Sequence, residues 1–315
     1  MADNKKNNVV GFFDSPIHQK RFEAAMDIWK DYPDAKHAMF NHSIFCQTYL
    51  PYRNPGDDAT DWEHKQGSAS LIIQCMKVKD PKTEKLIHLG LPYGTKARLI
   101  LAYLDTIAIK NQSPIVDVES SITGFTKAIG LSNSGRDIKD VKSQLARIAA
   151  SHITLNYLTE DQRSLNVNFT LVKKYDLWFP KNEGQRVLWP SYIELSNDYY
   201  EELCARAIPL DMRALAVLKN SPMALDTYRW LAQRLHRVKK GGQFITWKAM
   251  KDQFGSDYGA MKDFKRKFRL TLRDVKLVYR DARIEEDKNK GFNLYTSLPP
   301  IPKKTVVFLN PPRDS

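Results

Sequence analysis

The stretch Tyr258–Tyr295, YGAMKDFKRKFRLTLRDVKLVYRDARIEEDKNKGFNLY, decides the fold expected for this chain. On a helix with about 100° per residue, its apolar residues fall within roughly 80° of one another and form a stripe: Met261, Phe264, Phe268, Leu272 and Val275. The cations fall on the adjacent face: Lys262, Lys265, Arg266, Arg269, Arg273 and Lys276. We therefore expect a helix that buries one side and presents positive charge on the next.

A β-hairpin is expected after this helix. Residues 278–284 are typical of a strand and residues 292–297 of its partner, with the polar tip 285–291 between them. A helix followed by a charged hairpin is the outline of a winged helix, in which the helix enters the major groove of DNA and the hairpin lies along the backbone. The alternative is an amphipathic surface helix whose lysines and arginines are only solvated. This stretch alone leaves the choice open.

The composition indicates a folded chain with a polyanionic partner. Its 315 residues, 42% of them hydrophobic, suffice for two domains with a core each. The 49 Lys and Arg against 36 Asp and Glu give a formal net charge of +13, which favours nucleic acid, with an anionic membrane surface as the alternative. No apolar run approaches the roughly 20 residues that span a bilayer, and the N-terminus is polar, so we expect neither a membrane protein nor a signal peptide.

The three cysteines point to a reducing compartment. Cys46, Cys75 and Cys204 are widely spaced and odd in number, so they predict neither a disulfide framework nor a CxxC zinc site. We therefore expect a cytoplasmic protein whose cysteines are small buried hydrophobic residues.

The winged helix outline recurs upstream. Residues 119–129 predict a short helix, 131–135 a turn, 136–150 a helix, and 152–158 with 165–175 a hairpin. The helix carries Ile138, Val141, Leu145 and Ile148 on one face, with Arg136, Lys139 and Arg147 largely opposite and Lys142 at the boundary. The motif thus occurs twice.

Other elements follow from caps and periodicity. We expect helices at 16–33, 97–107, 196–203, 209–219, 221–238 and 247–254, strands at 43–50 and 115–118, a hairpin of strands 70–78 and 85–89, and a long loop at 51–67. The expected fold class is α+β with two tandem winged helix domains. The expected division is an arm at 1–14, a first domain at 15–179, a linker at 180–190, a second domain at 191–299 and a tail at 300–315.

Three long motifs resemble one known family. They are LPYGTKARLILAYLDTIAI (91–109), SITGFTKAIGLSNSGRDIKDVKSQLARIAASHITL (121–155) and IELSNDYYEELCARAIPLDMRALAVLKNSPMALDTYRWLAQRL (193–235). In this order they are similar to the plasmid-encoded RepA replication initiators, and the resemblance covers roughly 68–299. It implies a cytoplasmic bacterial initiator that binds repeated origin sites in double-stranded DNA, helps to open the duplex and helps to load host helicase, often with DnaA. It also implies a homodimer, formed through the first domain, that represses the gene of the protein.

The resemblance assigns the main DNA-reading role to the helix around 262–276. We expect Arg266, Arg269 and Arg273 to include the residues that read bases. Phosphate binding is expected of Lys262, Lys265, Lys276, Arg280, Lys288 and Lys290. In the first domain, which is expected to dimerise and to contact the DNA backbone, the corresponding residues are Arg136, Lys139, Lys142 and Arg147. The alternatives to an initiator are an origin-nicking endonuclease and a transcriptional repressor.

The sequence predicts no catalytic site. The sequence has no GxxxxGK[ST] loop and no GxGxxG after a strand, so no nucleotide hydrolysis is predicted. The spacings of His37, His42, Cys46 and His64 fit no common metal site, and the acids Asp57, Asp58, Asp61 and Glu63 are typical of a solvated loop. The pair Tyr199-Tyr200 lacks the metal-binding histidine motif that nicking chemistry needs. We expect no enzyme activity, no metal and no cofactor.

Overall fold

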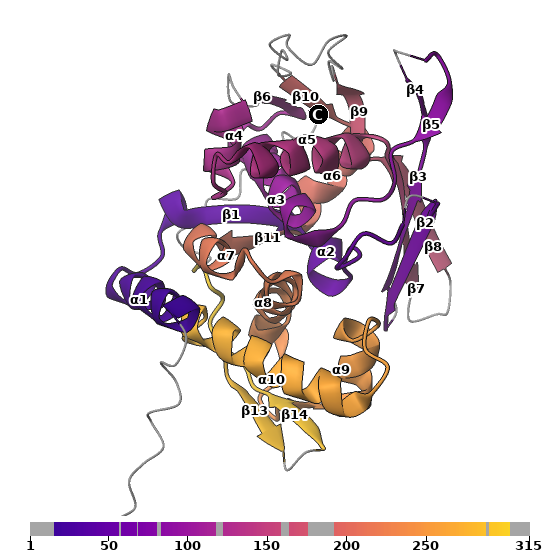
Figure 1. Cartoon of the computed structure of the whole chain (residues 1–315). Coiled ribbons are helices and arrows are strands. Elements are labelled where there is room, and N and C mark those ends of the chain that lie inside the picture. Colours follow the sequence, from indigo (N-terminus) through magenta and orange to yellow (C-terminus); the bar gives the residue numbers. More distant parts are fainter. Residues whose placement is uncertain are drawn as a thin grey trace, which may run out of the picture.

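The structure is a computed structural model of the chain, and it describes residues 16–56, 58–67, 69–80, 83–117, 122–158, 164–175, 192–287 and 290–302. Helices are interspersed with strands whose pairs are all antiparallel within these residues (Figure 1). The α+β class expected from the sequence is therefore confirmed. The expected arm 1–14 and the linker 180–190 lie outside the described residues, as does most of the expected tail.

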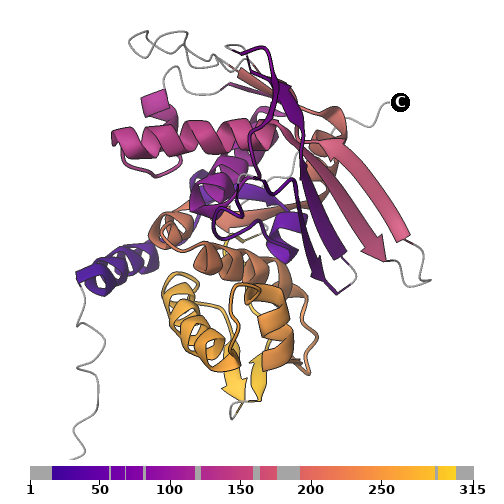
Figure 2. The same ribbon diagram turned by 45° about the vertical axis from the view of Figure 1, so that its right-hand side comes forward.

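The C-terminal unit has the element order of a winged helix. Along the chain it consists of α8 (Pro222–Arg234), β12 (Gln243–Thr246), α9 (Trp247–Phe254), α10 (Met261–Val278), β13 (Ile284–Asp287) and β14 (Gly291–Leu294). The strands form one sheet in the order β12-β14-β13. A Cβ atom at Gly291 would collide with the carbonyl of Ile245, so close pairing of the hairpin with β12 requires glycine there. Figure 2 shows α9 and α10 above this sheet.

The first unit repeats this order with one departure. Its elements are α3 (Gly94–Asn111), β6 (Ile115–Asp117), α4 (Ile122–Ala128), α5 (Gly135–Ala149), β7 (Ser151–Leu158), β8 (Ser164–Thr170) and β9 (Val172–Tyr175). Here β6 does not pair with the β7–β8 hairpin. It pairs with β10 (Tyr192–Leu195), and β10 pairs on its other side with β9. Strands β7 and β8 instead extend a sheet of order β2-β3-β7-β8, with β2 (Asp61–Gln66) and β3 (Ala69–Cys75).

The remaining elements lie before, between and after these two units in the sequence. In the N-terminal part they are α1 (Pro16–Lys30), η2 (Ala35–His37), β1 (Ala38–His42), α2 (Ile44–Gln47) and the hairpin of β4 (Lys77–Lys79) and β5 (Leu86–His88). Between the units they are α6 (Asn197–Arg206), β11 (Ala207–Asp211) and α7 (Met212–Leu218), and η3 (Leu235–Arg237) follows α8. No helix in the described part of the chain is long and apolar enough to cross a membrane.

Several element predictions are wrong. The expected strand 43–50 contains the helix α2, the expected loop 51–67 contains the edge strand β2, and only β4 and β5 form the hairpin expected from 70–78 and 85–89. In the expected helix 209–219, residues up to Asp211 belong to β11, where Pro209 lies opposite Phe40 of β1. The expected strand 278–284 begins within α10, since Val275 and Val278 continue the buried stripe, and β13 starts only at Ile284.

The two units share one core, and the N-terminal part joins both. Strand β1 pairs with β11, and α1 packs against α7 and α10 of the C-terminal half (Figure 1). One hydrophobic cluster runs from Ala25 through both units to Leu294. Contacts therefore cross the boundary expected between 15–179 and 191–299, and that division stays a prediction.

A buried ion pair joins the first helices of the two units. Arg98 of α3 donates from Nε and Nη2 to both carboxylate oxygens of Asp226 of α8, at 2.8 and 2.7 Å. The remaining donors of Arg98 reach the carbonyls of Leu50, Pro51 and Gly94. Nη2 of Arg229 donates to the carbonyl of Arg98 at 2.7 Å. The guanidinium thus fixes α3, α8 and the segment after α2 relative to one another.

A buried histidine forms a second contact between the units. His64 of β2 is 6% exposed, and its Nε2 lies 3.1 Å from the carbonyl of Gln253 in α9. Its ring packs on Tyr49, with ring centroids 3.8 Å apart. Burial lowers the pKa of His64 from 6.5 to about 4, so His64 is neutral in the folded protein.

We expect Asp226→Asn to lower the free energy of unfolding by about 3–5 kcal/mol, because it leaves the Arg98 guanidinium buried without its counter-charge. The control is Asp263→Asn on the surface of α10, which should change it by less than about 0.5 kcal/mol. Urea unfolding measures both variants. Equal, small losses would show that the pair does not hold the units together.

We expect His64 to make the folded protein sensitive to acid. Between pH 6.5 and about 4 the unfolded chain binds a proton at His64 that the folded chain does not, so stability is lost as the pH falls. The contribution is about 3 kcal/mol. Urea unfolding across this range should show a shallower loss for His64→Gln than for the wild type. Burial also lowers the pKa of His42, to about 3, so His42 makes stability depend on pH in the same direction. The difference between the wild type and His64→Gln therefore reports on His64 alone. Parallel pH profiles would contradict this assignment.

Candidate nucleic-acid interface

Helix α10 is held by an aromatic cluster beneath it. Phe264, Phe268 and Val275 are fully buried, Leu272 is nearly so, and Met261 packs against the core, which confirms the predicted apolar stripe. The rings of Phe254 and Phe292 lie 5.6 and 5.7 Å from that of Phe268. A Cβ atom at Gly255, which ends α9, would press on Phe264, so the turn into α10 is tight. The packing fixes which face of α10 points outward.

Helix α1 holds the C-terminal half of α10. Nη1 of Arg21 lies 2.6 Å from Oδ2 of Asp274, and Nε1 of Trp29 donates to the carbonyl of Leu277 at 2.7 Å. Both contacts lie past the middle of α10, whose N-terminal half remains open on the molecular surface.

The cations of α10 differ in exposure and in partners. Lys262, Arg266, Arg269 and Lys276 are exposed, and Lys265 and Arg273 are half-buried. The Arg266 side chain is 76% exposed, with Asp263 as an ion-pair partner at 3.9 Å. Nζ of Lys276 donates to the carbonyl of Ile284 at 3.3 Å, at the base of the hairpin. Lys262 and Arg266 therefore project from the open half of the helix.

Arg269 is held by the hairpin. Its Nε and Nη2 donate to the two carboxylate oxygens of Glu286 in β13, at 2.9 and 2.6 Å. Its guanidinium carbon lies 5.2 Å from the ring centroid of Trp247, and Nζ of Lys265 lies at the same distance from that ring. The hydrogen bond from Arg269 lowers the pKa of Glu286, so the pair is ionised at neutral pH.

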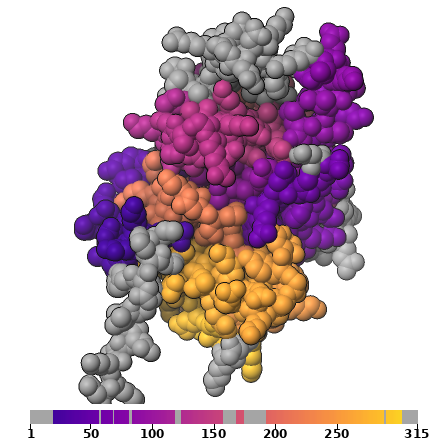
Figure 3. Space-filling model, in the orientation of Figure 1, coloured from indigo at the N-terminus to yellow at the C-terminus, as the bar shows by residue number. Residues whose placement is uncertain are grey.

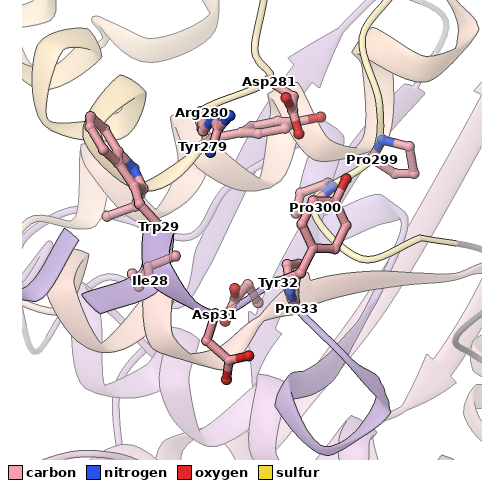
Figure 4. Close-up of a pocket in the computed structure, with 12 residues that line it drawn as sticks. Ile28, Trp29, Asp31, Tyr32, Pro33, Tyr279, Arg280, Asp281, Pro299 and Pro300 are labelled. Carbon is pink, nitrogen blue, oxygen red and sulfur yellow. The ribbon is translucent and has the colours of Figure 1, made fainter. Parts of the chain in front are cut away.

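The other cations predicted in this unit, outside α10, are Arg280, Lys288 and Lys290. Lys290 is exposed beside the tip of the hairpin, and Lys288 lies outside the described residues. Arg280 follows the C-terminus of α10 and lines a cavity of about 190 Å³ between the end of α1 and Pro299-Pro300 (Figure 4). The helix rises about 24 Å from Lys262 to its last residue, Val278, and Arg280 follows that end. Arg280 is thus separate from the open half of α10.

Helix α5 of the first unit carries less net positive charge. Ser134 caps its N-terminus by accepting from the backbone N–H of Asp137. Arg136 and Lys139 are exposed and Lys142 is half-buried, but Asp137 and Asp140 lie on the same helix. Nζ of Lys96 pairs with both acids, at 2.8 and 2.5 Å, and its hydrogen bond lowers the pKa of Asp137 to about 2.

Arg147 is tied into the fold. Its Nη1 donates to the carbonyl of Leu91 at 3.0 Å, and its guanidinium carbon lies 5.2 Å from the ring centroid of Tyr93. It is half-buried, and its backbone carbonyl accepts from Ser151. These contacts give Arg147 a structural role, whereas its DNA-binding role stays a prediction.

The two helices predicted to contact DNA lie on one face of the molecule. In Figures 1 and 3, α5 (magenta) is on the upper part of the visible face and α10 (orange) is on its lower part. Because one core joins the units, the spacing between these helices is set by the fold.

Other cations near α10 were missed by the sequence analysis. Arg53 follows α2 in the sequence, but it lies near Tyr258, just before α10. Partial burial raises the pKa of the Tyr258 phenol, and the charge of Arg53 opposes that rise. Lys267 on α10 and Lys248 in the first turn of α9 are exposed as well. Lys267 could have been found in the run KRKFR. Arg53 could not, because only the tertiary fold brings the segment after α2 beside α10.

His42 and Tyr199, which a metal site or nicking chemistry would need, are buried in the core. His42 is fully buried, with its Nδ1 accepting from the N–H of Ile44. The hydroxyl of Tyr199, also fully buried, donates to Oδ1 of Asp105 at 2.6 Å. Burial raises the pKa of Tyr199 well above its usual value, which disfavours a nucleophilic phenolate. Within the residues described, no group of three or more His, Cys, Asp or Glu side chains could hold a metal ion.

The plasmid-encoded RepA protein family matches residues 91–249, which is half of the chain. The chain belongs to this family. The RepA match begins just before α3 and ends in α9, so it covers the first unit and the start of the second. It bears out the resemblance to RepA replication initiators and supports an initiator role.

Solved structures show a similar fold. Domains 2–3 of RctB align with this RepA family member at a TM-score of 0.51 and 14% identity, covering 80% of this chain and 94% of that one. A selenomethionine derivative of the same two domains gives the same TM-score and identity, with 80% and 96% covered. At this identity the likeness concerns the fold. No curated protein matches the chain in sequence.

We expect Arg147→Ala to lower the free energy of unfolding by about 1–2 kcal/mol, because it removes the bond to Leu91 and the contact with Tyr93. The control is Arg136→Ala at the exposed start of the same helix, which should change it by less than about 0.5 kcal/mol. Thermal or urea unfolding tests the pair, and equal effects would contradict a structural role for Arg147.

Proposed function

We propose that this RepA family member is a plasmid replication initiator that binds repeated origin sites in double-stranded DNA. It acts in the cytoplasm, helps to open the duplex and recruits host helicase together with DnaA. As a homodimer it represses its own gene, which couples initiation to plasmid copy number. It has no catalytic activity or cofactor of its own, and the nucleotide hydrolysis needed for unwinding comes from the host helicase.

The observation that carries the proposal is the presentation of α10. The helix rests on buried aromatic rings, and Lys262 and Arg266 project from its open half, next to a hairpin with the exposed Lys290. The major groove of DNA is about 12 Å wide and admits a helix, while a hairpin beside it can follow the backbone. An ordinary solvated helix explains the charge but not this combination of element order, exposed cations and family.

The first unit supports a second contact with the same DNA. Helix α5 lies on the same face as α10, with Arg136 and Lys139 exposed, but the acids beside Lys96 reduce its net positive charge. We propose that α5 contributes backbone contacts and that α10 contributes most of the sequence reading. The first unit then positions the protein on the DNA through phosphates, and the second unit recognises the base sequence.

The initiator proposal is favoured over an origin-nicking endonuclease. Tyr199 is enclosed by Asp105, His42 and Phe169, so its hydroxyl cannot reach a phosphodiester without unfolding of the core. Tyr200 is half-buried, and burial raises the pKa of its hydroxyl to about 12.

We expect the chain to bind direct repeats flanking its own gene with an affinity that falls steeply as salt rises. Arg266→Ala should weaken binding by about 5- to 150-fold, which corresponds to about 1–3 kcal/mol for a base contact. Lys262→Ala should reduce the slope of log affinity against log salt by about one. The control is Lys79→Ala, an exposed lysine on the separate β4–β5 hairpin, which should change neither quantity.

Fluorescence anisotropy over a salt series measures these quantities. If the wild type binds the repeats and the Arg266→Ala variant binds them equally well, the role proposed for α10 is contradicted. Supercoiled origin DNA incubated with the protein and Mg²⁺ or Mn²⁺ should stay closed, and nicked circles would favour the endonuclease instead.

A further inference from the structure

We propose that Glu286 determines DNA specificity by holding Arg269 in one direction and keeping its guanidinium from pairing with phosphates. The inference rests on the proposed function, because it concerns how α10 reads DNA. Glu286 lies on β13, outside the helix, so it acts on the DNA through Arg269 and is a positioning residue.

The geometry of the pair restricts Arg269. Its Nε and Nη2 bond the two oxygens of Glu286, so the Nε–Nη2 edge of the planar guanidinium is occupied. Because the guanidinium is planar, these two bonds also fix the plane of its second edge, which is formed by Nη1 and Nη2. A guanidinium edge of this kind matches O6 and N7 of guanine, the commonest specific contact in the major groove.

Trp247 fixes the pair from below. The indole is 3% exposed, and its ring centroid lies 4.7 Å from that of Phe292 and 6.0 Å from that of Phe268. This packing favours one orientation of the ring, and the Arg269 guanidinium lies over it. Arg269 therefore meets an ion pair on one side and a rigid aromatic face on another. Such preorganisation lowers the entropy cost of placing a long side chain against a base.

The carboxylate also excludes an alternative contact. Arginine binds phosphate as readily as it binds guanine, and a phosphate contact adds affinity without sequence information. Glu286 is ionised at neutral pH and 28% exposed on the side chain, so it repels a phosphate that approaches Arg269. Repulsion of phosphate by Glu286 would therefore increase the preference of Arg269 for a base over the DNA backbone.

The test uses the full chain and a duplex that the wild type selects from a random-sequence library, with a scrambled duplex for comparison. Glu286→Gln removes the charge and the bidentate acceptor while keeping the size. The control is Glu285→Gln, which removes the same charge from an exposed neighbour, whereas it is the carboxylate of Glu286 that accepts from Arg269. Arg269→Ala and the double variant Arg269→Ala/Glu286→Gln complete a double-mutant cycle.

We expect Glu286→Gln to bind the scrambled duplex about 3- to 10-fold more tightly and to lose discrimination between the two duplexes by about 5-fold or more. Its salt slope on the scrambled duplex should rise by about one, because Arg269 then reaches a phosphate. Glu285→Gln should shift both affinities equally and keep the ratio. In the Arg269→Ala background, Glu286→Gln should behave as Glu285→Gln does.

An unchanged ratio and salt slope for Glu286→Gln, while Arg269→Ala weakens binding, would overturn the inference and leave the proposed function intact. The same holds if Glu286→Gln changes the ratio equally with and without Arg269, since Glu286 would then act directly. A wild type that selects no sequence at all would instead defeat the proposed function itself.

Discussion

The buried ion pair between Arg98 and Asp226 is the constraint on which the arrangement of the molecule depends. It joins α3 and α8, the first helices of the two units, and Arg98 also holds the segment after α2 through two carbonyls. Taking two charges out of water costs free energy, so a buried ion pair contributes little net stability. Removing one partner, however, strongly destabilises the fold, because the other charge is left buried and unpaired. The pair therefore favours one relative position of α3 and α8. Through that position the fold determines where α5 and α10 stand relative to each other.

Local patterns predicted the longer helices, while the short helix α2 and the long-range strand pairing escaped them. The stripe on α10 and the caps Ser196, Ser221 and Thr246 follow from short sequence windows, and each of these caps accepts a backbone hydrogen bond. The pairing of β1 with β11 and the insertion of β10 join segments that are remote in sequence. Strand β2 has mostly polar side chains, and only His64 among them is buried, so its sequence pattern resembles that of a loop.

The candidate site was predictable in its location but not in the roles of its side chains. A helical projection places Arg266 and Arg269 on one cationic face, yet the structure leaves Arg266 outward and fixes Arg269 against Glu286. A helical projection of α5 likewise places Arg136 and Arg147 on one face, although in the structure Arg147 donates to the carbonyl of Leu91. These differences depend on which residues approach from other elements. A single-helix pattern does not contain that information.

The central claim is that one rigid body presents α5 and α10 to the same face of a DNA duplex. Methylation interference on a single selected site tests it most directly, because methylation of guanine N7 blocks contacts in the major groove. We expect a strong cluster of interfering guanines where α10 enters the groove. We also expect ethylation interference at phosphates on the same face of the duplex, about one helical turn away, where α5 lies. Interference confined to the minor groove, or spread around the whole duplex, would contradict it.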